Sequence, residues 1–258
     1  MKFRKIKSPA TKTIEFRLKK ELDARVYLTP QPAYNFVPEW FKDMPRYQHG
    51  DKELHLQPSN LTAKHCVPLM DGFTSGYMLV TACDLEVKPV EKVLPAEMLN
   101  DPNITINAPA PIINQSYPSM PIIQHREYEL AKDIPAPEGY YPGVWTWSTP
   151  NQIITPPGYS VWFMHPANRY DLPFITSSGV IDCDKNGGYG GYIPFFLRKG
   201  FEGLIPKGTP IIQIFPFKRE NWEKYDSPKI ENLMGPLQQT TVGVGFYRNN
   251  AWTKKSYK

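Results

Sequence analysis

The sequence predicts a mainly β protein with a few short helices, and three observations support that prediction. Proline makes up 28 of the 258 residues, a density that removes backbone donors and interrupts helices. Apolar runs of about five to eight residues recur along the second half of the chain, with Gly and Pro turn signals between them. Turn signals about ten residues apart are typical of a sandwich, a barrel or a related closed β structure.

The length of the chain allows one large domain or two small ones. No internal repeat and no low-complexity tract divides the sequence. We therefore expect a single β-rich domain over residues 1–258. Its expected parts are a basic arm at 1–12, an N-terminal elaboration at 13–122, a β core at 144–217, and a C-terminal helix and tail at 218–258.

Positive charge is concentrated at the two ends of the chain. The net charge is +5, and the first twenty residues hold eight Lys or Arg against one Glu. The last six residues, "TKKSYK", hold three Lys. Basic ends of this kind can contact nucleic acid or another acidic surface, although only weakly. Solvated ends that keep the protein in solution are the favoured interpretation.

Cysteine usage indicates a reducing compartment. Cys66, Cys83 and Cys183 are odd in number and form no C-x-x-C pair, so a disulfide framework is not expected. No apolar run approaches the roughly 18 residues of a membrane span. The basic N-terminus lacks the apolar stretch of a signal peptide. We expect synthesis in the cytoplasm and no membrane partner.

The first half of the chain contains few regular elements. "TIEFRL" (13–18) is expected to form a first strand. "FVPEWFKDMPRY" (36–47) has apolar residues at helical spacing and Pro near its start, so we expect a short helix. Its Trp40 is assigned to the core or to a subunit contact, and a ligand platform is the less favoured alternative. A helical turn and then one buried strand are expected over 63–87.

The second half is expected to alternate strands and turns. The Pro-rich and Asn-rich stretch 88–122 predicts loops with short strands, and 122–131 alternates like a strand. Pro and Gly mark the turns that follow. The remaining expected elements are strands within 144–164, a β-hairpin over 175–196, strands within 192–217, a helix at 218–226, and an edge strand or tail at 240–247.

Candidate metal ligands are few, because the chain has only five His. His65 and Cys66 are adjacent and would point apart in an extended chain, so we interpret both as structural. His125 and Glu127 are two residues apart and resemble the start of a cupin metal triad, but the remaining ligands have no suitable spacing. We therefore predict no metal site.

The stretch "ITSSGVIDCDKNGGYGGYIPFF" (175–196) holds the leading candidate site residues, Asp182 and Asp184. In a hairpin the two carboxylates would lie on one side of a strand, where like charges repel unless they are solvated, paired or bound to a cation. Lys185, Arg169 and Lys207 are the expected partners. The same stretch could instead be a catalytic loop, and the hairpin is the favoured interpretation.

Residues 152–217 resemble the core of the trimeric dUTPase and dCTP-deaminase superfamily. The resemblance is carried by "GYSVWFMHPANR", "SGVIDCD" and "LIPKGTPIIQIF". It implies a β-clip fold, or a jelly-roll-like closed β structure, and nucleotide pyrophosphate hydrolysis with Mg²⁺. In that case Asp182 would be the general base and Asp184 would orient the base or the metal. The implied ligand contacts are Arg169 for phosphate, Tyr189 for sugar, and Gln213 in the segment that packs the site.

The family's phosphate-binding Arg-Ser-Ser is absent, because "HPANRYDLP" stands in its place. A second resemblance covers more of the chain. "PEWFKDMP", "KHCVPLMDGFTSGYML" and "GTPIIQIFPFKRENW" are similar to an uncharacterised family of bacteriophages and some bacteria. That resemblance implies a phage setting and no chemistry.

We therefore expect a non-catalytic structural or accessory protein that uses a dUTPase-like scaffold, binds protein partners or copies of itself as in a homotrimer, and needs no cofactor. It would be made in the host cytoplasm and could enter the virion. A divergent nucleotide pyrophosphatase with Mg²⁺ is the alternative.

Overall fold

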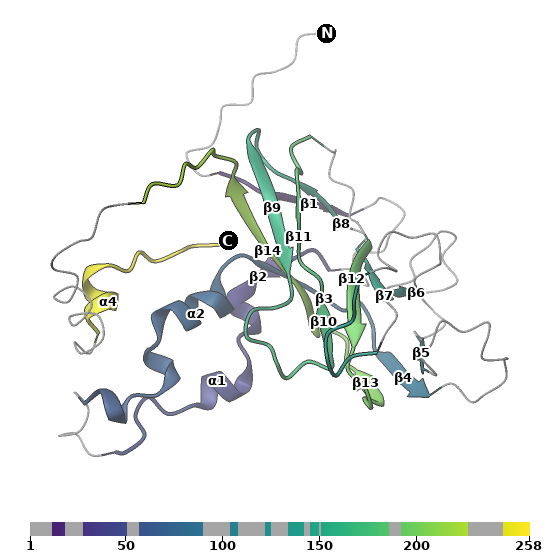
Figure 1. Cartoon of the computed structure of the whole chain (residues 1–258), viewed down its shortest axis with the longest axis horizontal. Helices are drawn as coiled ribbons and strands as arrows, with labels where there is room; N and C mark the ends of the chain where they lie inside the picture. Colours follow the sequence, from purple (N-terminus) through teal and green to yellow (C-terminus); the bar gives the residue numbers. More distant parts are fainter. Residues whose placement is uncertain are drawn as a thin grey trace, which may run out of the picture. The chain divides into compact units, whose positions relative to one another are not determined.

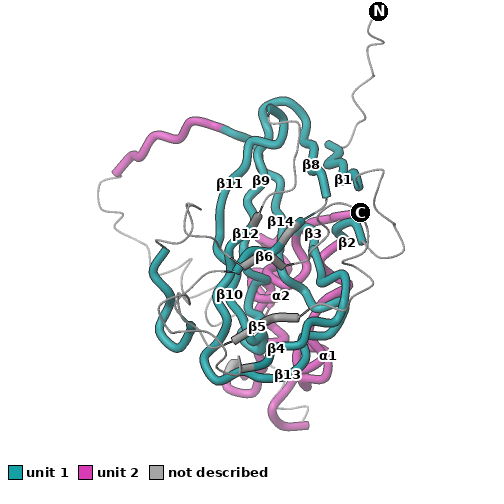
Figure 2. The backbone as a smooth tube through the Cα atoms, turned by 90° about the vertical axis from the view of Figure 1, so that its right-hand side faces the viewer, with its two compact units in different colours: residues 1–31, 76–219 teal, residues 32–75, 220–258 magenta. Residues whose placement is uncertain are grey.

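The computed structural model of the chain describes residues 12–18, 28–50, 57–89, 104–107, 122–124, 134–141, 145–149, 151–185, 192–226 and 245–258. The chain divides into two compact units (Figure 2). Unit 1 comprises residues 1–31 and 76–219, and unit 2 comprises residues 32–75 and 220–258. Unit 1 contains nearly all of the strands, so the mainly β prediction is confirmed.

The largest sheet of unit 1 has five strands in the order β11-β9-β14-β3-β2. Its central strand β14 is nine residues long and pairs antiparallel with both β9 and β3, as Figure 1 shows. Residues 210–214 of β14 are all buried, and Ile212 and Ile214 belong to the hydrophobic core. The bounds are β2 Gln31–Pro32, β3 Tyr77–Val80, β9 Tyr159–Met164, β11 Gly179–Ile181 and β14 Pro210–Lys218.

Three smaller sheets complete the β structure. A four-stranded sheet has the order β10-β12-β7-β6, a three-stranded sheet has the order β13-β4-β5, and β1 pairs with β8. Among the described strands no barrel closes. The bounds are β1 Glu15–Leu18, β4 Leu85–Pro89, β5 Ile104–Asn107, β6 Ile122–Gln124, β7 Trp145–Ser148, β8 Asn151–Ile154, β10 Phe174–Thr176, β12 Tyr192–Leu197 and β13 Gly203–Ile205.

An aromatic cluster forms the centre of the unit 1 core. The rings of Trp147 and Phe195 stack with centroids 3.8 Å apart, and Phe174 packs edge-on against Trp147 at 4.9 Å. All three side chains are almost completely buried. Burial of each such side chain stabilises the fold by roughly 1.5–3 kcal/mol. This cluster joins β7, β10 and β12, three strands that are distant in sequence.

The hairpin predicted over 175–196 is confirmed only at its two ends, where Ile175 is opposite Phe196, and the turn at 177–178 joins two strands that do not pair. β10 pairs with β12, whereas β11 pairs with β9 in the five-stranded sheet. The chain therefore crosses from one sheet to the other at residues 177–178. The buried hydroxyl of Thr176 donates to Ile211 O at 2.7 Å and accepts the Trp147 Nε1–H at 3.0 Å. These bonds hold the end of β10 in the core, so β11 cannot fold back on it.

The single strand predicted over 77–87 is wrong, because residues 81–84 separate β3 from β4. Thr81 N donates to Thr209 O, and the Thr81 hydroxyl donates to Pro206 O. Asp84 then accepts the backbone N–H of Lys207 at 2.7 Å. The chain leaves the five-stranded sheet at this point and joins the three-stranded sheet as β4.

Unit 2 contains short helices. Its elements are η1 Ala33–Phe36, α1 Glu39–Asp43, η3 Pro58–Asn60, η4 Ala63–His65, α2 Val67–Thr74 and α4 Phe246–Asn250. Phe41 and Phe73 are buried with ring centroids 4.8 Å apart, and Trp40 packs edge-on against Phe73. Asp71 accepts bonds from Trp252 Nε1 and from Lys255 Nζ, which ties the C-terminal segment to α2.

Several boundaries in unit 2 differ from the predictions. The helix expected over 36–47 shrinks to α1, because Pro38 caps its start and Pro45 follows its end. The helix expected at 218–226 is absent, since β14 extends to Lys218 and the following residues are irregular. Phe246 and Tyr247 are helical instead of belonging to an edge strand. Residues 240–244 lie outside the described part of the chain.

No helix in the described part of the chain has the length and apolar character that a membrane crossing requires.

Gly76 is required where the chain approaches β14. Its φ is +78°, and a Cβ at this position would lie 2.3 Å from the backbone oxygen of Ile214. Gly139 has a similar φ of +81° with no atom within 4 Å of the added Cβ. We predict that Gly139→Ala costs about 1–2 kcal/mol of unfolding free energy, and that Gly76→Ala costs roughly 1–3 kcal/mol more. Urea unfolding measures both, and equal losses would contradict the close approach.

Candidate functional site

The two candidate carboxylates follow β11 and converge on one cation. Asp182 and Asp184 lie in the turn after Ile181, and both reach the guanidinium of Arg219, which follows β14 directly. The expected partners Lys185, Arg169 and Lys207 were therefore wrong. Arg219 also donates its backbone N–H to Gly158 O at 2.9 Å, so both its main chain and its side chain fix this corner of the sheet.

Asp184 is fully engaged by its neighbours. Arg219 Nη1 donates to Asp184 Oδ1 at 2.8 Å, Nη2 donates to Oδ2, and Gly158 N–H donates to Oδ2 at 2.8 Å. The Asp184 side chain is only 6% exposed. A fork of two parallel N–H donors is the strongest arrangement by which a protein holds a carboxylate. Asp184 is therefore a structural anchor between the turn after β11 and the end of β14.

Asp182 is more open than Asp184, although it also has two partners. Ser160 Oγ donates to Asp182 Oδ1 at 2.6 Å, and Arg219 Nη1 lies 3.2 Å from the same oxygen. The Asp182 side chain is 46% exposed. Ser160 in turn accepts from Arg219 Nη1 at 2.9 Å, so its hydroxyl bridges the cation and Asp182. We call Ser160, Asp182, Asp184 and Arg219 the Arg219 cluster.

The Arg219 cluster shifts the pKa of its members in the directions expected for an ion pair. The Arg219 fork, aided by the Gly158 N–H, lowers the pKa of Asp184 to about 2. The Asp184 carboxylate raises the pKa of Arg219. Burial, and then the charges of Asp182 and Asp184, raise the pKa of the Cys183 thiol to about 11. Cys183 therefore stays protonated at neutral pH and is a poor nucleophile.

The chemistry open to this cluster is limited. A general base must hold a water and accept its proton, but Asp184 has both oxygens occupied by donors. A cation bound to both carboxylates would have to displace Arg219. In the described residues no group of three His, Cys, Asp or Glu side chains is placed to hold a metal ion. Asp182 is the only member of the Arg219 cluster with a substantial exposed carboxylate surface.

Of the other predicted ligand contacts, Gln213 and Arg169 have partners outside the Arg219 cluster. Gln213 is fully buried, and its Oε1 accepts the Ala167 N–H at 2.8 Å. Gln213 is six positions before Arg219, which follows β14 directly, and six extended positions span about 20 Å. Arg169 forms a two-pronged pair with Asp171, with Nε and Nη2 each 2.8 Å from a carboxylate oxygen. Tyr189 lies outside the described residues, as do His125 and Glu127.

A buried polar network at His165 was missed from the sequence. Thr176 N–H donates to His165 Nδ1 at 3.3 Å, so Nε2 carries the ring proton and donates to Arg169 O at 3.1 Å. Burial lowers the pKa of His165 and favours this neutral form. The only sequence feature that could have indicated this network is the His in "FMHPANR", and no recognisable motif surrounds it. The network supports the loop that carries Arg169 and is structural.

Three further candidates lie in unit 2. Trp40 packs edge-on against Phe41 and Phe73, but its side chain is 45% exposed, so it lies at the edge of that cluster and not in the core. The His65 ring lies 5.1 Å from the Tyr47 ring, and in the described chain its buried Nε2 has no hydrogen-bond partner. Cys66, the next residue, is exposed.

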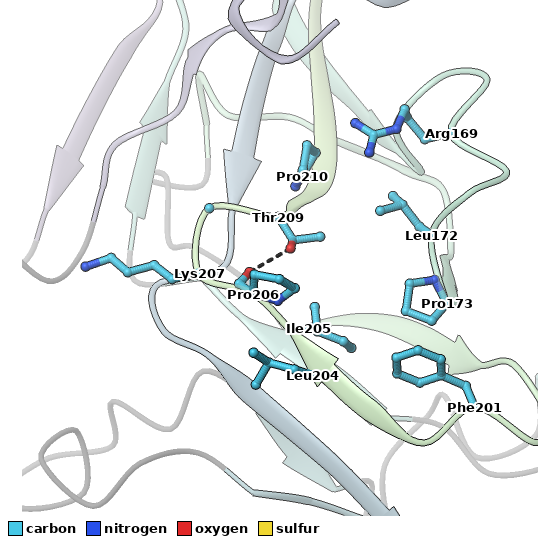
Figure 3. Close-up of a pocket in the computed structure, with 11 residues that line it drawn as sticks. Arg169, Leu172, Pro173, Phe201, Leu204, Ile205, Pro206, Lys207, Thr209 and Pro210 are labelled. Atoms are coloured by element: carbon cyan, nitrogen blue, oxygen red, sulfur yellow. Dashed lines mark hydrogen bonds between the residues drawn. The ribbon is translucent and has the colours of Figure 1, made fainter. Parts of the chain in front are cut away.

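A surface hollow lies near the opposite end of β14 from the Arg219 cluster. It encloses about 360 Å³ and is mostly apolar. In Figure 3 the guanidinium of Arg169 points across the hollow toward Pro210, whereas the Lys207 side chain points away from it. We call this feature the β14 hollow, and its lining residues are Arg169, Leu172, Pro173, Phe201, Leu204, Ile205, Pro206, Lys207, Gly208, Thr209 and Pro210.

Comparison with known proteins adds no assignment. No protein-family model matches the chain, and no curated protein matches it. The function must therefore be inferred from the geometry of the chain itself.

The pKa of Asp184 gives a direct test of the Arg219 cluster. Because the native pKa is below the ordinary value of 3.8, the stabilisation is complete above pH 3.8 and is lost as pH falls through about 2. We predict that Arg219→Gln moves the Asp184 pKa up toward 3.8 and lowers the melting temperature by several degrees at pH 7. Carboxyl carbon NMR measures the pKa.

The matched control is Lys224→Gln, which breaks an exposed ion pair with Asp226 and should leave both quantities unchanged. An Asp184 pKa that stays low in Arg219→Gln would contradict the assignment of Arg219 as its cause.

Proposed function

We propose that the chain is a non-catalytic, β-rich protein that works through contacts with other protein chains, including copies of itself. The observation that carries this proposal is the Arg219 cluster. The two carboxylates that could have formed a hydrolytic centre bind one arginine and a serine, and Gln213, one of the implied ligand contacts, lies about 20 Å along the strand from Arg219. The bonds that join β9, β14 and the turn after β11 are enough to explain why the residues of the Arg219 cluster lie together.

Exposed aromatic and apolar side chains support a role in protein contacts. Trp162 of β9 and Val180 of β11 are opposite each other on one sheet face, and both are substantially exposed. Trp222 and Tyr225 are 87% and 81% exposed. Aromatic residues are enriched where proteins bind one another, so these side chains are the ones best suited to such contacts.

The proposal also includes a scaffold type, an oligomeric state and a cellular location. The resemblance of residues 152–217 supports a β-clip-like scaffold and an assembly such as a homotrimer. The similarity to a phage family supports synthesis in a host cytoplasm and a place in or near the virion. A fold alone does not establish a chemistry, so neither resemblance requires catalysis.

A nucleotide pyrophosphatase is the second candidate, and the half-exposed carboxylate of Asp182 is the observation that favours it. In this candidate Asp182 would activate a water, and Mg²⁺ would neutralise the phosphates. The bonds from Ser160 and Arg219 both go to the oxygen Oδ1, so Oδ2 is the oxygen that would hold the water.

Replacement of Asp182 separates the two candidates. We predict that Asp182→Asn lowers the melting temperature slightly, because it removes the charge that Arg219 faces. We also predict that neither the wild-type protein nor the variant releases pyrophosphate. The test measures pyrophosphate release and thermal shift on a panel of nucleoside triphosphates, with and without Mg²⁺. Asp43→Asn, at an exposed position of α1, is the matched control. Mg²⁺-dependent pyrophosphate release that Asp182→Asn abolishes would contradict the proposal.

A further inference from the structure

We propose that Trp222 of one copy of the chain binds in the β14 hollow of a second copy. This inference rests on the proposed function and names its partner and its contact. The structure contains a tryptophan that is 87% exposed, and a mostly apolar hollow with Arg169 among its lining residues. The two features are chemically complementary.

The donor is the segment that follows β14. Residues 219–226 have no regular secondary structure, and residues 220–226 are all exposed. Trp222 is the most exposed of the large hydrophobic side chains in the described chain, at 87%. Burial of a tryptophan removes a large apolar area from water, and tryptophan is among the residues that most often dominate the energy of an interface.

The acceptor has the features that an indole requires. The volume of about 360 Å³ is within the range of small binding pockets. The side chains of Leu172, Phe201 and Leu204 provide apolar walls, and Leu204 is 54% exposed. A guanidinium such as that of Arg169 packs favourably on the face of an indole.

The length of the chain indicates that the contact joins two copies. The β14 hollow includes Pro210, the first residue of β14, whereas Trp222 comes four residues after Lys218, the last residue of β14. β14 spans about 27 Å at about 3.4 Å per residue. Four extended residues reach only about 14 Å. Even with the length of an indole added, Trp222 cannot reach the β14 hollow of its own chain.

Charges near both features favour the same pairing. Lys224 pairs with Asp226 at 2.9 Å, so Glu223, which directly follows Trp222, is the acidic group that accompanies the indole. Lys207 lies exposed at the edge of the hollow, and its bond to Asp84 uses its backbone N–H and leaves the ammonium available. When Trp222 enters the hollow, rotation of the Lys207 side chain brings its ammonium to Glu223. Such pairs at the rim of an interface add specificity.

A contact between opposite ends of β14 constrains the assembly. If the donor of each copy enters the hollow of the next, the contact is heterologous and closes into a ring when the rotation permits. Two copies that exchange donors form a closed dimer by the same contact. In both arrangements every hollow and every Trp222 is occupied.

Cross-linking of mixed copies tests the contact directly. Both proteins carry Cys66→Ser, because Cys66 is exposed while Cys83 and Cys183 are buried. One protein then carries Asn221→Cys, which is exposed and leaves Trp222 in place, and the other carries Leu204→Cys. A short bismaleimide joins thiols that lie close together, and we expect a covalent pair between the two positions, identified by mass spectrometry. Tyr34→Cys, at an exposed position of η1, mixed with Leu204→Cys is the control and should give no such pair.

Substitution at the donor measures the strength of the contact. We expect Trp222→Ala to raise the dissociation constant of the oligomer about tenfold or more, and Tyr34→Ala, which removes an exposed aromatic side chain from η1, to leave it unchanged. Both side chains are exposed in the chain, so the fold should survive, and circular dichroism checks this.

The outcomes separate the contact from the proposed function. A stable oligomer that survives Trp222→Ala and gives no cross-link to Leu204→Cys would overturn the contact and leave the proposed function standing. A wild-type protein that stays monomeric at all concentrations would contradict both.

Discussion

The ion pair between Arg219 and Asp184 is the interaction on which the arrangement of the large sheet depends. β14 is the central strand of that sheet, and Arg219 is the first residue after it. The arginine fork holds the turn after β11, its Nη1 also bonds Tyr159 O and Ser160 Oγ of β9, and its backbone bonds Gly158. One side chain therefore locks β9, β11 and β14 together where all three would otherwise fray.

This constraint explains why the most enzyme-like stretch of the sequence is structural. Two acidic residues separated by one position are a common way to bind a cation, and here the cation is a guanidinium from the same chain. A buried ion pair stabilises a fold only when both partners are satisfied. Asp184 meets that condition with donors on both oxygens, and the half-exposed Asp182 adds a second negative charge beside Arg219.

Strands marked by local patterns could be predicted from the sequence, whereas contacts between residues distant in the chain could not. The apolar run "IIQIF" and the flanking Pro and Gly predicted β14, and "TIEFRL" predicted β1, because both signals lie within a few residues. Arg219 lies 35 residues from Asp184, and no local pattern connects them. The break at Thr81 was also invisible, because "TAC" continues the apolar run and the cause is a pair of bonds to Pro206 and Thr209.

The helix predicted at 218–226 failed for a related reason. Its composition favours a helix, but pairing with β9 continues to Lys218, and Arg219 is fixed by the cluster. The first residues of the segment therefore have an extended conformation, and the aromatic residues that follow are exposed to water. In this account the exposed segment is the part of the molecule that acts, and the Arg219 cluster is what fixes its starting point.

The central claim is that the protein works by association with other copies of itself. Sedimentation velocity of the wild-type protein over a hundredfold range of concentration tests it most directly. The account predicts a discrete oligomer that dissociates only toward the lowest concentrations. A single species at the mass of one 29.6 kDa chain throughout the range would contradict it.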